Sequence, residues 1–440
     1  MTDPTYDPVL AVRLRAYAEG GVRPIDALKT AEGAILNRRA RESARPPLTL
    51  LAAAFLIVGA AVAALVAGAS DVPKPPTGSV VFGYADDGLR SLWRVDLPSN
   101  VSTELVRSQR GTAVSPDGRH FAWVETRPDE DDQVHIGDTT SLDDVTLPAA
   151  GEVWAWQHPL TTVPRCYDCP NSTFTWSPGG RWVSWAECAG VESCHLVVSA
   201  SDGSSRKVLQ PSFFARDVNY DVGLFWPRDD QLIVRLPGLG FQMADGDGQN
   251  LRAMPDGLLP SSPDGRWTVA GSASELTIMA QDNTVKSRVT FPGEEFTGVE
   301  WAPDSSLLSL WFFDRDDAPR LRLEHLGLVG IDGRVTRVEV PGATELGPPR
   351  DIRLAPGNGP VRWSPDSSRL AVYGTIVGRD GRLIGAVADV GMAAWSWDSH
   401  HLAVAGPGSS RVSVVDADGS HRQEIGPSTA AQVDQLVWVP

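Results

Sequence analysis

The stretch that decides the fold reads WSPDSSRLAVYG, from Trp363 to Gly374. Pro365-Asp366-Ser367 has the composition of a tight turn, and the residues after it alternate between apolar and polar, as a half-buried strand requires. Related stretches recur along the chain as VSPDGRHFAWV from Val114, WSPGGRWVSWA from Trp176, WPRDDQLIV from Trp226, SSPDGRWTVAG from Ser261, WAPDSSLLSLWF from Trp301 and WSWDSHHLAVAG from Trp395.

The spacing of these copies predicts a blade. They follow one another at intervals of about 32 to 62 residues, and a second hairpin signal often comes after them, at Ser201-Asp202-Gly203, Asp332-Gly333 and Asp418-Gly419. Strand, turn, strand, turn at such intervals is typical of the four-stranded blade of a β-propeller. The predicted fold class is therefore all-β.

These motifs resemble the WD40-like PD40 repeats of the TolB-type β-propeller family, which also occur in the propeller domains of prolyl-oligopeptidase-like peptidases. The resemblance covers roughly residues 78–440 and implies a propeller, but it implies little about function. Two copies depart from the pattern. Trp226-Pro227-Arg228-Asp229 lacks the serine, and the interval from Trp363 to Trp395 is too short for a full fourth strand.

The two ends of the repeat region complement each other. The chain ends in QLVWVP, Gln435 to Pro440, where a further turn would follow, while VVFGY from Val80 and SLWRVD from Ser91 look like the strands that normally come after such a turn. We expect the C-terminal strand to complete the N-terminal blade, because closure removes exposed sheet edges. The count is then eight blades, with seven as the alternative.

Residues 48–69 read LTLLAAAFLIVGAAVAALVAGA and contain no charge. At 1.5 Å per helical residue they cover about 33 Å, enough for one transmembrane helix. Arg38, Arg39, Arg41 and Arg45 flank the N-terminal side, so the positive-inside rule places residues 1–47 in the cytoplasm. A cleaved signal peptide is the alternative; the long leader and long apolar run favour an uncleaved anchor.

Residues 1–47 form a short segment that we expect to be helical and cytoplasmic. Pro8 and Pro24 stand where helices could begin, and Gly20-Gly21 separates them. The second helix has a small apolar stripe, which is either a docking surface for a cytoplasmic protein or a stalk against the membrane or a second copy.

Charge excludes one class of partner. The net charge is -16, and residues 1–47 carry 8 Arg/Lys against 6 Asp/Glu, so the remainder, with 31 against 49, is at about -18. Such a surface repels phosphate backbones, and we expect no nucleic-acid partner. Almost all basic residues are Arg, a codon-usage hint of a bacterial source.

The four cysteines, Cys166, Cys169, Cys188 and Cys194, are candidates for structural disulfides because an exported domain is in an oxidising environment. We expect the insertion 158–175 to be attached to the 188–194 hairpin by disulfides rather than two local bridges. A zinc knuckle is the alternative, although the second cysteine pair is too widely spaced for the usual ribbon.

Other candidate sites favour structural interpretations. Asp245–Asn250 resembles a calcium loop superficially but coincides with an expected hairpin turn, and the acidic run Asp129–Asp132 is expected to be a solvated loop. His400-His401 is expected at a strand entrance. We find no Gly-x-Ser-x-Gly nucleophile motif and no His-x-x-x-His pair. The sequence therefore predicts no catalytic residues, no metal ligands and no cofactor.

The expected organisation is a cytoplasmic segment (1–47), a transmembrane helix (48–69), a linker (70–78) and an extracytoplasmic propeller (79–440), in a bacterial cell membrane. We expect a non-enzymatic binding, sensing or scaffolding module. The bilayer would be its partner through residues 48–69, and a protein, peptide or glycan would bind the propeller. One alternative is a propeller enzyme, a lyase or hydrolase, with its site at the central channel. A purely structural envelope protein is another.

Overall fold

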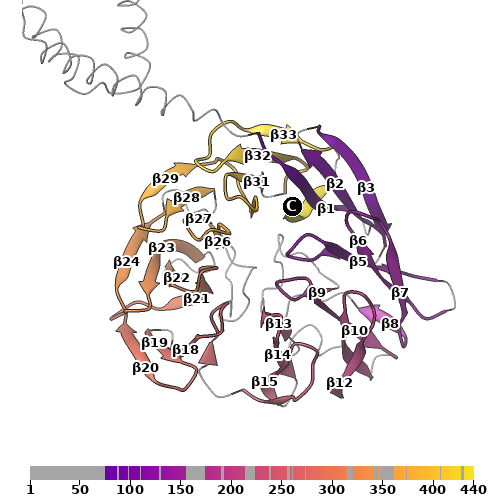
Figure 1. The fold of residues 1–440 in the computed structure, drawn as a ribbon, viewed down its shortest axis with the longest axis horizontal. Helices are drawn as coiled ribbons and strands as arrows, with labels where there is room; N and C mark the ends of the chain where they lie inside the picture. Colours follow the sequence, from indigo (N-terminus) through magenta and orange to yellow (C-terminus); the bar gives the residue numbers. More distant parts are fainter. Residues whose placement is uncertain are drawn as a thin grey trace, which may run out of the picture. The chain divides into compact units, whose positions relative to one another are not determined.

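The computed structural model shows eight β-sheets arranged as blades around one axis (Figure 1). It describes residues 75–86, 89–97, 99–109, 111–127, 130–154, 174–189, 193–213, 223–236, 239–254, 258–259, 261–272, 274–314, 321–340, 345–346, 361–372, 374–406, 408–427 and 431–440. These belong to one compact unit, Lys74–Pro440. The predicted all-β propeller of eight blades is confirmed.

Each blade is an antiparallel sheet whose strands follow one another from the ring axis outward. Blade 1 consists of β34 (Gln432–Val439), β1 (Gly78–Asp86), β2 (Leu89–Leu97) and β3 (Val101–Ser108). Blade 2 consists of β4 (Thr112–Val114), β5 (His120–Glu125), β6 (Gln133–Asp138) and β7 (Asp144–Pro148). Blade 4 consists of β13 (Gly223–Arg228), β14 (Gln231–Leu236), β15 (Gly240–Asp245) and β16 (Arg252–Ala253).

Three more blades are regular in topology. Blade 5 consists of β17 (Leu258–Leu259), β18 (Trp267–Ser272), β19 (Glu275–Ala280) and β20 (Val285–Thr290). Blade 7 consists of β26 (Val361–Trp363), β27 (Arg369–Val372), β28 (Thr375–Gly378) and β29 (Leu383–Ala386). Blade 8 consists of β30 (Met392–Trp395), β31 (His401–Ala405), β32 (Val412–Asp416) and β33 (Gln423–Ile425).

Two blades carry a divided strand. In blade 3, β8 (Glu152–Trp154) and β9 (Thr175–Trp176) both pair with β10 (Trp182–Cys188), which is followed by β11 (Cys194–Ala200) and β12 (Arg206–Phe213). In blade 6, β21 (Phe296–Trp301), β22 (Leu307–Asp314), β23 (Leu321–Gly330) and β24 (Val335–Glu339) are joined by β25 (Glu345–Leu346), which pairs with β23.

The predicted closure is confirmed in blade 1. The C-terminal strand β34 pairs with β1 from Ser79↔Val439 to Ala85↔Gln432, so the last strand of the chain is the innermost strand of the first blade. Trp438 is 3% exposed and its Nε1–H donates to the Thr77 carbonyl at 3.1 Å. Closure therefore rests on both backbone pairing and a buried indole.

One expectation about blade 7 is wrong. The short interval between Trp363 and Trp395 still accommodates four strands, because each strand is only three or four residues long. Asp380-Gly381 makes the last hairpin tight: the Gly381 amide donates to the Gly378 carbonyl at 2.9 Å. The short repeat therefore shortens every strand of blade 7 without removing one.

The outer hairpin turns share one device. In seven blades an aspartate at the start of the turn accepts the backbone N–H two residues later, at 2.7–3.0 Å, which satisfies an amide that the turn leaves without a strand partner. The residues are Asp138, Asp202, Asp247, Asp282, Asp332, Asp380 and Asp418. The predicted turns at Asp202-Gly203, Asp332-Gly333 and Asp418-Gly419 are therefore confirmed, and Asp245–Asn250 is also a turn, joining β15 to β16.

The inner hairpin turns bond to the next blade. The Asp264 amide of blade 5 donates to Ser305 Oγ of blade 6 at 3.0 Å, and the Asp304 amide of blade 6 donates to Ser367 Oγ of blade 7 at 2.9 Å. The Asp366 amide of blade 7 donates to Ser399 Oγ of blade 8 at 3.1 Å.

The same ring of contacts continues through the other blades, and we call it the turn belt. Trp397 Nε1–H of blade 8 donates to the Trp438 carbonyl of blade 1 at 3.0 Å, and the Gly179 amide of blade 3 donates to Asp229 Oδ1 of blade 4 at 2.8 Å. Glycine occupies the fourth turn position where the approach is closest: a Cβ at Gly180 would overlap the Asp117 carboxylate, and one at Gly265 would overlap the Arg228 guanidinium. Val439 is similarly close to Gly118, so all eight junctions are in contact.

The apolar core lies between the blades. Seven clusters of buried side chains occupy seven of the eight junctions in the part of the chain that the structure describes. In six of the eight blades a tryptophan before the inner turn packs toward the preceding blade, and these residues are 3–8% exposed. These residues are Trp176, Trp226, Trp301, Trp363, Trp395 and Trp438.

The expected cytoplasmic segment (1–47), the expected transmembrane helix (48–69) and most of the linker lie outside the described residues. Within the described ranges, no helix is long and apolar enough to cross a membrane.

Deletion of residues 434–440 should destroy the closed ring. It removes Trp438 and Val439, which are 3% and 4% exposed, and leaves β1 without its inner partner. Full burial of one large apolar side chain contributes about 1.5–3 kcal/mol, and a typical domain is stable by only about 5–15 kcal/mol. The truncated protein should aggregate or unfold at a much lower temperature, while Val101→Ser, at a side chain 56% exposed, should not. An unchanged melting temperature after truncation would refute the closure.

Substitutions at Ser367 should measure the turn belt. Ser367 is 0% exposed, has a φ of 60°, and accepts the Asp304 amide. Ser367→Ala removes this acceptor and should destabilise the domain by about 1–2 kcal/mol in denaturant unfolding. Ser367→Gly removes the same acceptor but tolerates the left-handed conformation better, by about 1 kcal/mol, so its loss should be smaller. Equal stabilities for all three proteins would contradict this role.

Candidate functional site

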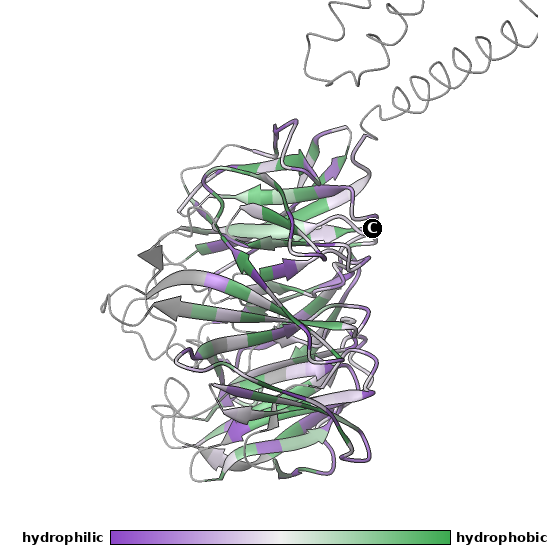
Figure 2. Cartoon of the chain, turned by 90° about the vertical axis from the view of Figure 1, so that its left-hand side faces the viewer, coloured by the Kyte–Doolittle hydropathy of each residue, from purple (hydrophilic) through white to green (hydrophobic). Residues whose placement is uncertain are grey.

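Strand direction gives the propeller two different faces. All inner and outer hairpin turns lie at one end of the strands, including 115–119, 139–143, 302–306 and 396–400, and we call this end the turn face. All connections between the second and third strands, and between blades, lie at the other end, which we call the loop face. Figure 2 shows the C-terminus and the compact hydrophilic turns on the right-hand side, which is the turn face.

The longest connections belong to the loop face and the inner strand of blade 3. Residues 214–222 connect β12 to β13, and β25 lies within the connection from β24 to β26. Residues 155–174 separate the two halves of the divided inner strand of blade 3. The described turn-face connections are all short. For the inner turns the turn belt gives a reason, because it leaves no room for insertion between neighbouring turns. The long connections are therefore confined to the loop face and to the inner strand of blade 3.

A disulfide crosses a loop-face hairpin. Cys188 and Cys194 are bonded to each other and their Cα atoms are 4.0 Å apart. They are direct cross-strand partners of β10 and β11, so neither is available to hold another segment. The expectation that the 158–175 insertion is attached to this hairpin is therefore wrong for these two cysteines, and a zinc site using all four is ruled out. Cys166 and Cys169 lie outside the described residues.

A buried carboxylate that we did not predict from the sequence supports the same hairpin. Glu187 is 3% exposed, accepts two hydrogen bonds from Arg206 Nη2 at 2.6 and 2.7 Å, one from Trp185 Nε1 at 2.7 Å, and one from the Ala150 amide at 2.9 Å. Because all of these groups donate to one carboxylate, Glu187 fixes their positions relative to one another. A glutamate inside an otherwise apolar strand, WVSWAEC, was the available signal.

The acidic run is only partly the solvated loop that we expected. Asp132 is 4% exposed, and its Oδ2 accepts the Val153 amide at 2.7 Å. This carboxylate links the loop to the inner strand of the next blade, which is why it is buried. Glu130 is exposed, as predicted, and Asp129 lies outside the described residues.

The expected strand entrance at His400-His401 is confirmed. His401 begins β31, is 3% exposed and stacks on Trp438 at 6.2 Å between ring centroids. His400 is exposed beside it. Within the described part of the chain, no group of three or more His, Cys, Asp or Glu side chains is arranged to hold a metal ion.

One ionisable group on the inner wall has a strongly shifted pKa. Glu300 lies on β21, the inner strand of blade 6, and its Oε2 is buried without a hydrogen-bond partner among the described residues, although the residue as a whole is partly exposed. Burial raises the pKa of Glu300 to about 7, and Arg362 on the next inner strand opposes this rise. A carboxyl that titrates near neutrality suits proton transfer.

A second, mostly buried acidic side chain lies on β34, the strand that closes the ring. Asp434 of β34 is the extra residue at the bulge opposite Gly83 and Tyr84, and its Oδ2 lies 2.9 Å from Arg90 Nη1. Burial raises the pKa of Asp434, and Arg90 partly opposes the rise. A Cβ at Gly83 would meet the Asp434 carboxylate, so the glycine makes room for this ion pair.

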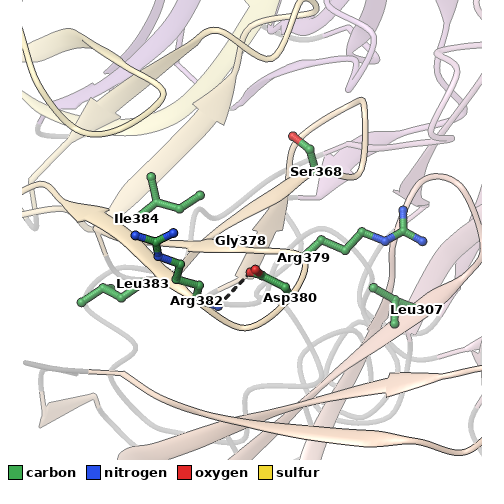
Figure 3. A pocket seen from close by; sticks show the side chains of 8 residues that line it. All are labelled: Leu307, Ser368, Gly378, Arg379, Asp380, Arg382, Leu383 and Ile384. Atoms are coloured by element: carbon green, nitrogen blue, oxygen red, sulfur yellow. Dashed lines mark hydrogen bonds between the residues drawn. The ribbon is translucent and has the colours of Figure 1, made fainter. Parts of the chain in front are cut away.

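An open depression of about 740 Å³ lies on the turn face between blades 6 and 7 (Figure 3). Arg379 on its wall bonds to Asp304 and Ser306 of the neighbouring blade, and the Arg382 amide donates to Asp380 Oδ1 at 3.0 Å. The lining residues are Leu307, Ser368, Gly378, Arg379, Asp380, Arg382, Leu383 and Ile384. We predicted none of these side chains as a site from the sequence.

No protein-family model matches the chain, and no curated protein matches it in sequence. Similar solved structures include a eukaryotic initiation factor (15% identity, TM-score 0.46, 82% of this chain and 98% of that one). They also include TolB from Acinetobacter baumannii (12%, 0.36, 82% and 67%) and apo AztD from Citrobacter koseri (11%, 0.48, 82% and 97%). At these values the likeness extends to the fold alone.

The cysteines can be counted chemically. Without reductant, the protein purified from its native compartment should show no free thiol after denaturation and no bound zinc. The double variant Cys188→Ser/Cys194→Ser should lose about 2 kcal/mol of stability, since the disulfide closes a short loop with a sequence separation of 6. Four free thiols in the unreduced parent, or stoichiometric zinc bound by Cys188 and Cys194, would contradict the Cys188–Cys194 disulfide, and two free thiols would show that Cys166 and Cys169 are not bonded.

Proposed function

We propose that this protein is a membrane-anchored extracytoplasmic β-propeller that acts as a binding, sensing or scaffolding module through its loop face. The observation that carries the proposal is the asymmetry of the ring. The turn face consists of short turns, of which the inner ones are bonded to one another, and the loop face carries connections that vary widely in length. Loops held by a rigid scaffold are where proteins most often place recognition residues.

The described loop-face residues support recognition of a folded or extended partner. The Cys188–Cys194 disulfide and the saturated Glu187 brace one hairpin, so it can present its connection without a large ordering cost. Leu239, in the connection between β14 and β15, is 52% exposed on the same face. A preformed, partly apolar surface of this kind suits a protein, peptide or glycan.

The anchor and the cytoplasmic segment come from the sequence. The uncharged run 48–69, flanked by arginines on its N-terminal side, supports a single-pass topology with the propeller outside the cytoplasm. Residues 1–47, with two expected helices, would then carry a signal to a cytoplasmic partner.

Reporter fusions test the topology. A reporter that is active only outside the cytoplasm should work when fused after Pro440 and should fail when fused before Arg38. The reverse pattern would overturn the orientation. Loss of residues 1–69 from the mature protein, measured by intact mass, would show a cleaved signal peptide and remove the anchor from the proposal.

Matched substitutions test the loop face. The full chain in detergent should capture a partner from native membranes, and Leu239→Arg should abolish the capture. Val101→Arg, at an equally exposed side chain on the turn-face perimeter, should not. Both variants should keep the parent melting temperature. Loss of capture by Val101→Arg alone would assign binding to the other face.

A second candidate is a propeller enzyme, a lyase or hydrolase, and the shifted pKa of Glu300 favours it. Because burial raises this pKa to about 7, the carboxyl is protonated in the folded protein below neutrality while it is ionised in the unfolded chain above about 4.5. The native state therefore binds the extra proton between these pH values, and its stability falls as pH rises through this window.

The Glu300→Gln variant tests both the pKa and the enzyme. From pH 5 to pH 7.5 the parent should lose stability relative to Glu300→Gln, measured by thermal unfolding. Parallel pH profiles would contradict the raised pKa. If an activity is found, loss of about 10²–10⁴-fold in Glu300→Gln would support general acid–base catalysis by this residue. Unchanged activity would exclude Glu300 from it.

A further inference from the structure

Exposed apolar side chains gather on the turn face. Among the described residues, ten large hydrophobic side chains are exposed, and only two of them, Leu89 and Leu239, lie at the loop face. The other eight stand in a turn or within the first two residues of the strand after it. They are Val101, Leu142, Val145, Val285, Val335, Leu383, Ile384 and Trp397. We call this set the apolar rim.

Two members of the rim adjoin cationic groups. Leu383 and Ile384 are 50% and 39% exposed and line the depression that also contains Arg379 and Arg382 (Figure 3). Trp397, 47% exposed, stands in an inner turn, and its Nε1–H is already bonded to the Trp438 carbonyl. Tryptophan, arginine and isolated aliphatic side chains are residue types that suit the headgroup region of a bilayer.

The chain reaches the propeller at this same face. Gly78, the first residue of β1, lies beside Val439 at the turn-face end of the closing strand, and the Thr77 carbonyl is bonded to Trp438. Between the expected end of the anchor at Ala69 and Gly78, residues 70–77 can span at most about 28 Å.

Linker length decides between the two faces. With the loop face toward the bilayer, the linker would first have to run back along the depth of the ring. β1 alone has 9 residues, or about 30 Å of extended strand, which equals the whole reach of the linker. With the turn face toward the bilayer, the same linker allows direct contact.

We propose that the apolar rim of the turn face is a lipid-contacting surface that rests on the headgroups around the chain's own anchor, while the loop face points away from the membrane. This inference rests on the anchored topology proposed above. Trp397, Leu383 and Ile384 provide the apolar contacts, and the exposed Arg382 faces the phosphates, while Arg379 stays paired with Asp304. The outer-turn aspartates, with Asp202, Asp282 and Asp418 held ionised by hydrogen bonds that lower their pKa, make contact with zwitterionic lipid more favourable than with anionic lipid.

Site-specific fluorescence tests the contact. The full chain, carrying one fluorescent amino acid in place of Leu383 or of Leu239, is reconstituted into phosphatidylcholine vesicles with a nitroxide on the lipid headgroup. The two positions are matched, since these leucines are 50% and 52% exposed on opposite faces. Quenching should be several-fold stronger at 383, and should weaken when phosphatidylglycerol replaces part of the lipid at low salt.

The outcomes separate this inference from the proposed function. Flotation with the vesicles is measured first: a chain that does not float lacks the anchor, which overturns both. A floating chain with equal quenching at the two positions, or stronger quenching at 239, overturns the lipid-contacting face and leaves the anchor intact. A floating chain with no quenching at 383, but energy transfer between copies labelled there, shows that a second copy covers the rim, which also overturns the proposal.

Discussion

One short turn holds each blade against both of its neighbours. In the Trp-Ser-Pro-Asp-Ser motif, the tryptophan side chain packs into the cluster shared with the preceding blade, while the aspartate amide bonds to the serine of the following blade. That serine must adopt a left-handed backbone to present its Oγ, as the φ values of 60–62° at Ser305, Ser367 and Ser399 show. Where the neighbour comes closer still, only glycine fits. The choice between Gly and Ser at this position therefore follows the distance to the preceding blade.

This contact makes the two faces unequal. Inner turns that are bonded to one another cannot lengthen without breaking the turn belt. The inner connections on the turn face are therefore short and uniform in length. The opposite ends of the strands have no such constraint, and there the connections differ in length and some are braced individually, by the disulfide of blade 3 or by the buried Glu187. A rigid ring whose connections differ in length on one face suits the recognition role that we propose.

Ring closure extends the same logic to the chain ends. The junction between blades 8 and 1 uses a buried tryptophan and a turn contact, as other junctions do. What differs is that the inner strand of blade 1 comes from the C-terminus and pairs with β1. At two positions the inner strands carry an acidic side chain with buried carboxylate oxygens instead of an apolar one. Asp434 sits at the bulge of the closing strand, and Glu300 on the inner wall carries a pKa near 7. An apolar residue at position 300 would avoid the desolvation cost of the carboxylate. At position 434 it would instead leave the mostly buried Arg90 without its ion pair, so Asp434 has a structural role.

By itself, the sequence determined the repeat, the turns, the all-β class and the closure by Gln435–Pro440, because each depends on local composition: a turn needs Pro, Asp and Gly within five residues, and a half-buried strand needs alternation along its own length. Only the tertiary structure decided the rest. It paired Cys188 with Cys194, since they are cross-strand partners, and it buried Asp132 and Glu187 through bonds to distant backbone and side chains. It also kept four strands in blade 7, and brought Glu300 and Arg362 together from separate blades. The disulfide and the short strands of blade 7 are local, but the composition of their segments does not fix the strand register. The contacts of Asp132, Glu187 and Glu300 join segments that are far apart in the sequence and become neighbours only around the ring.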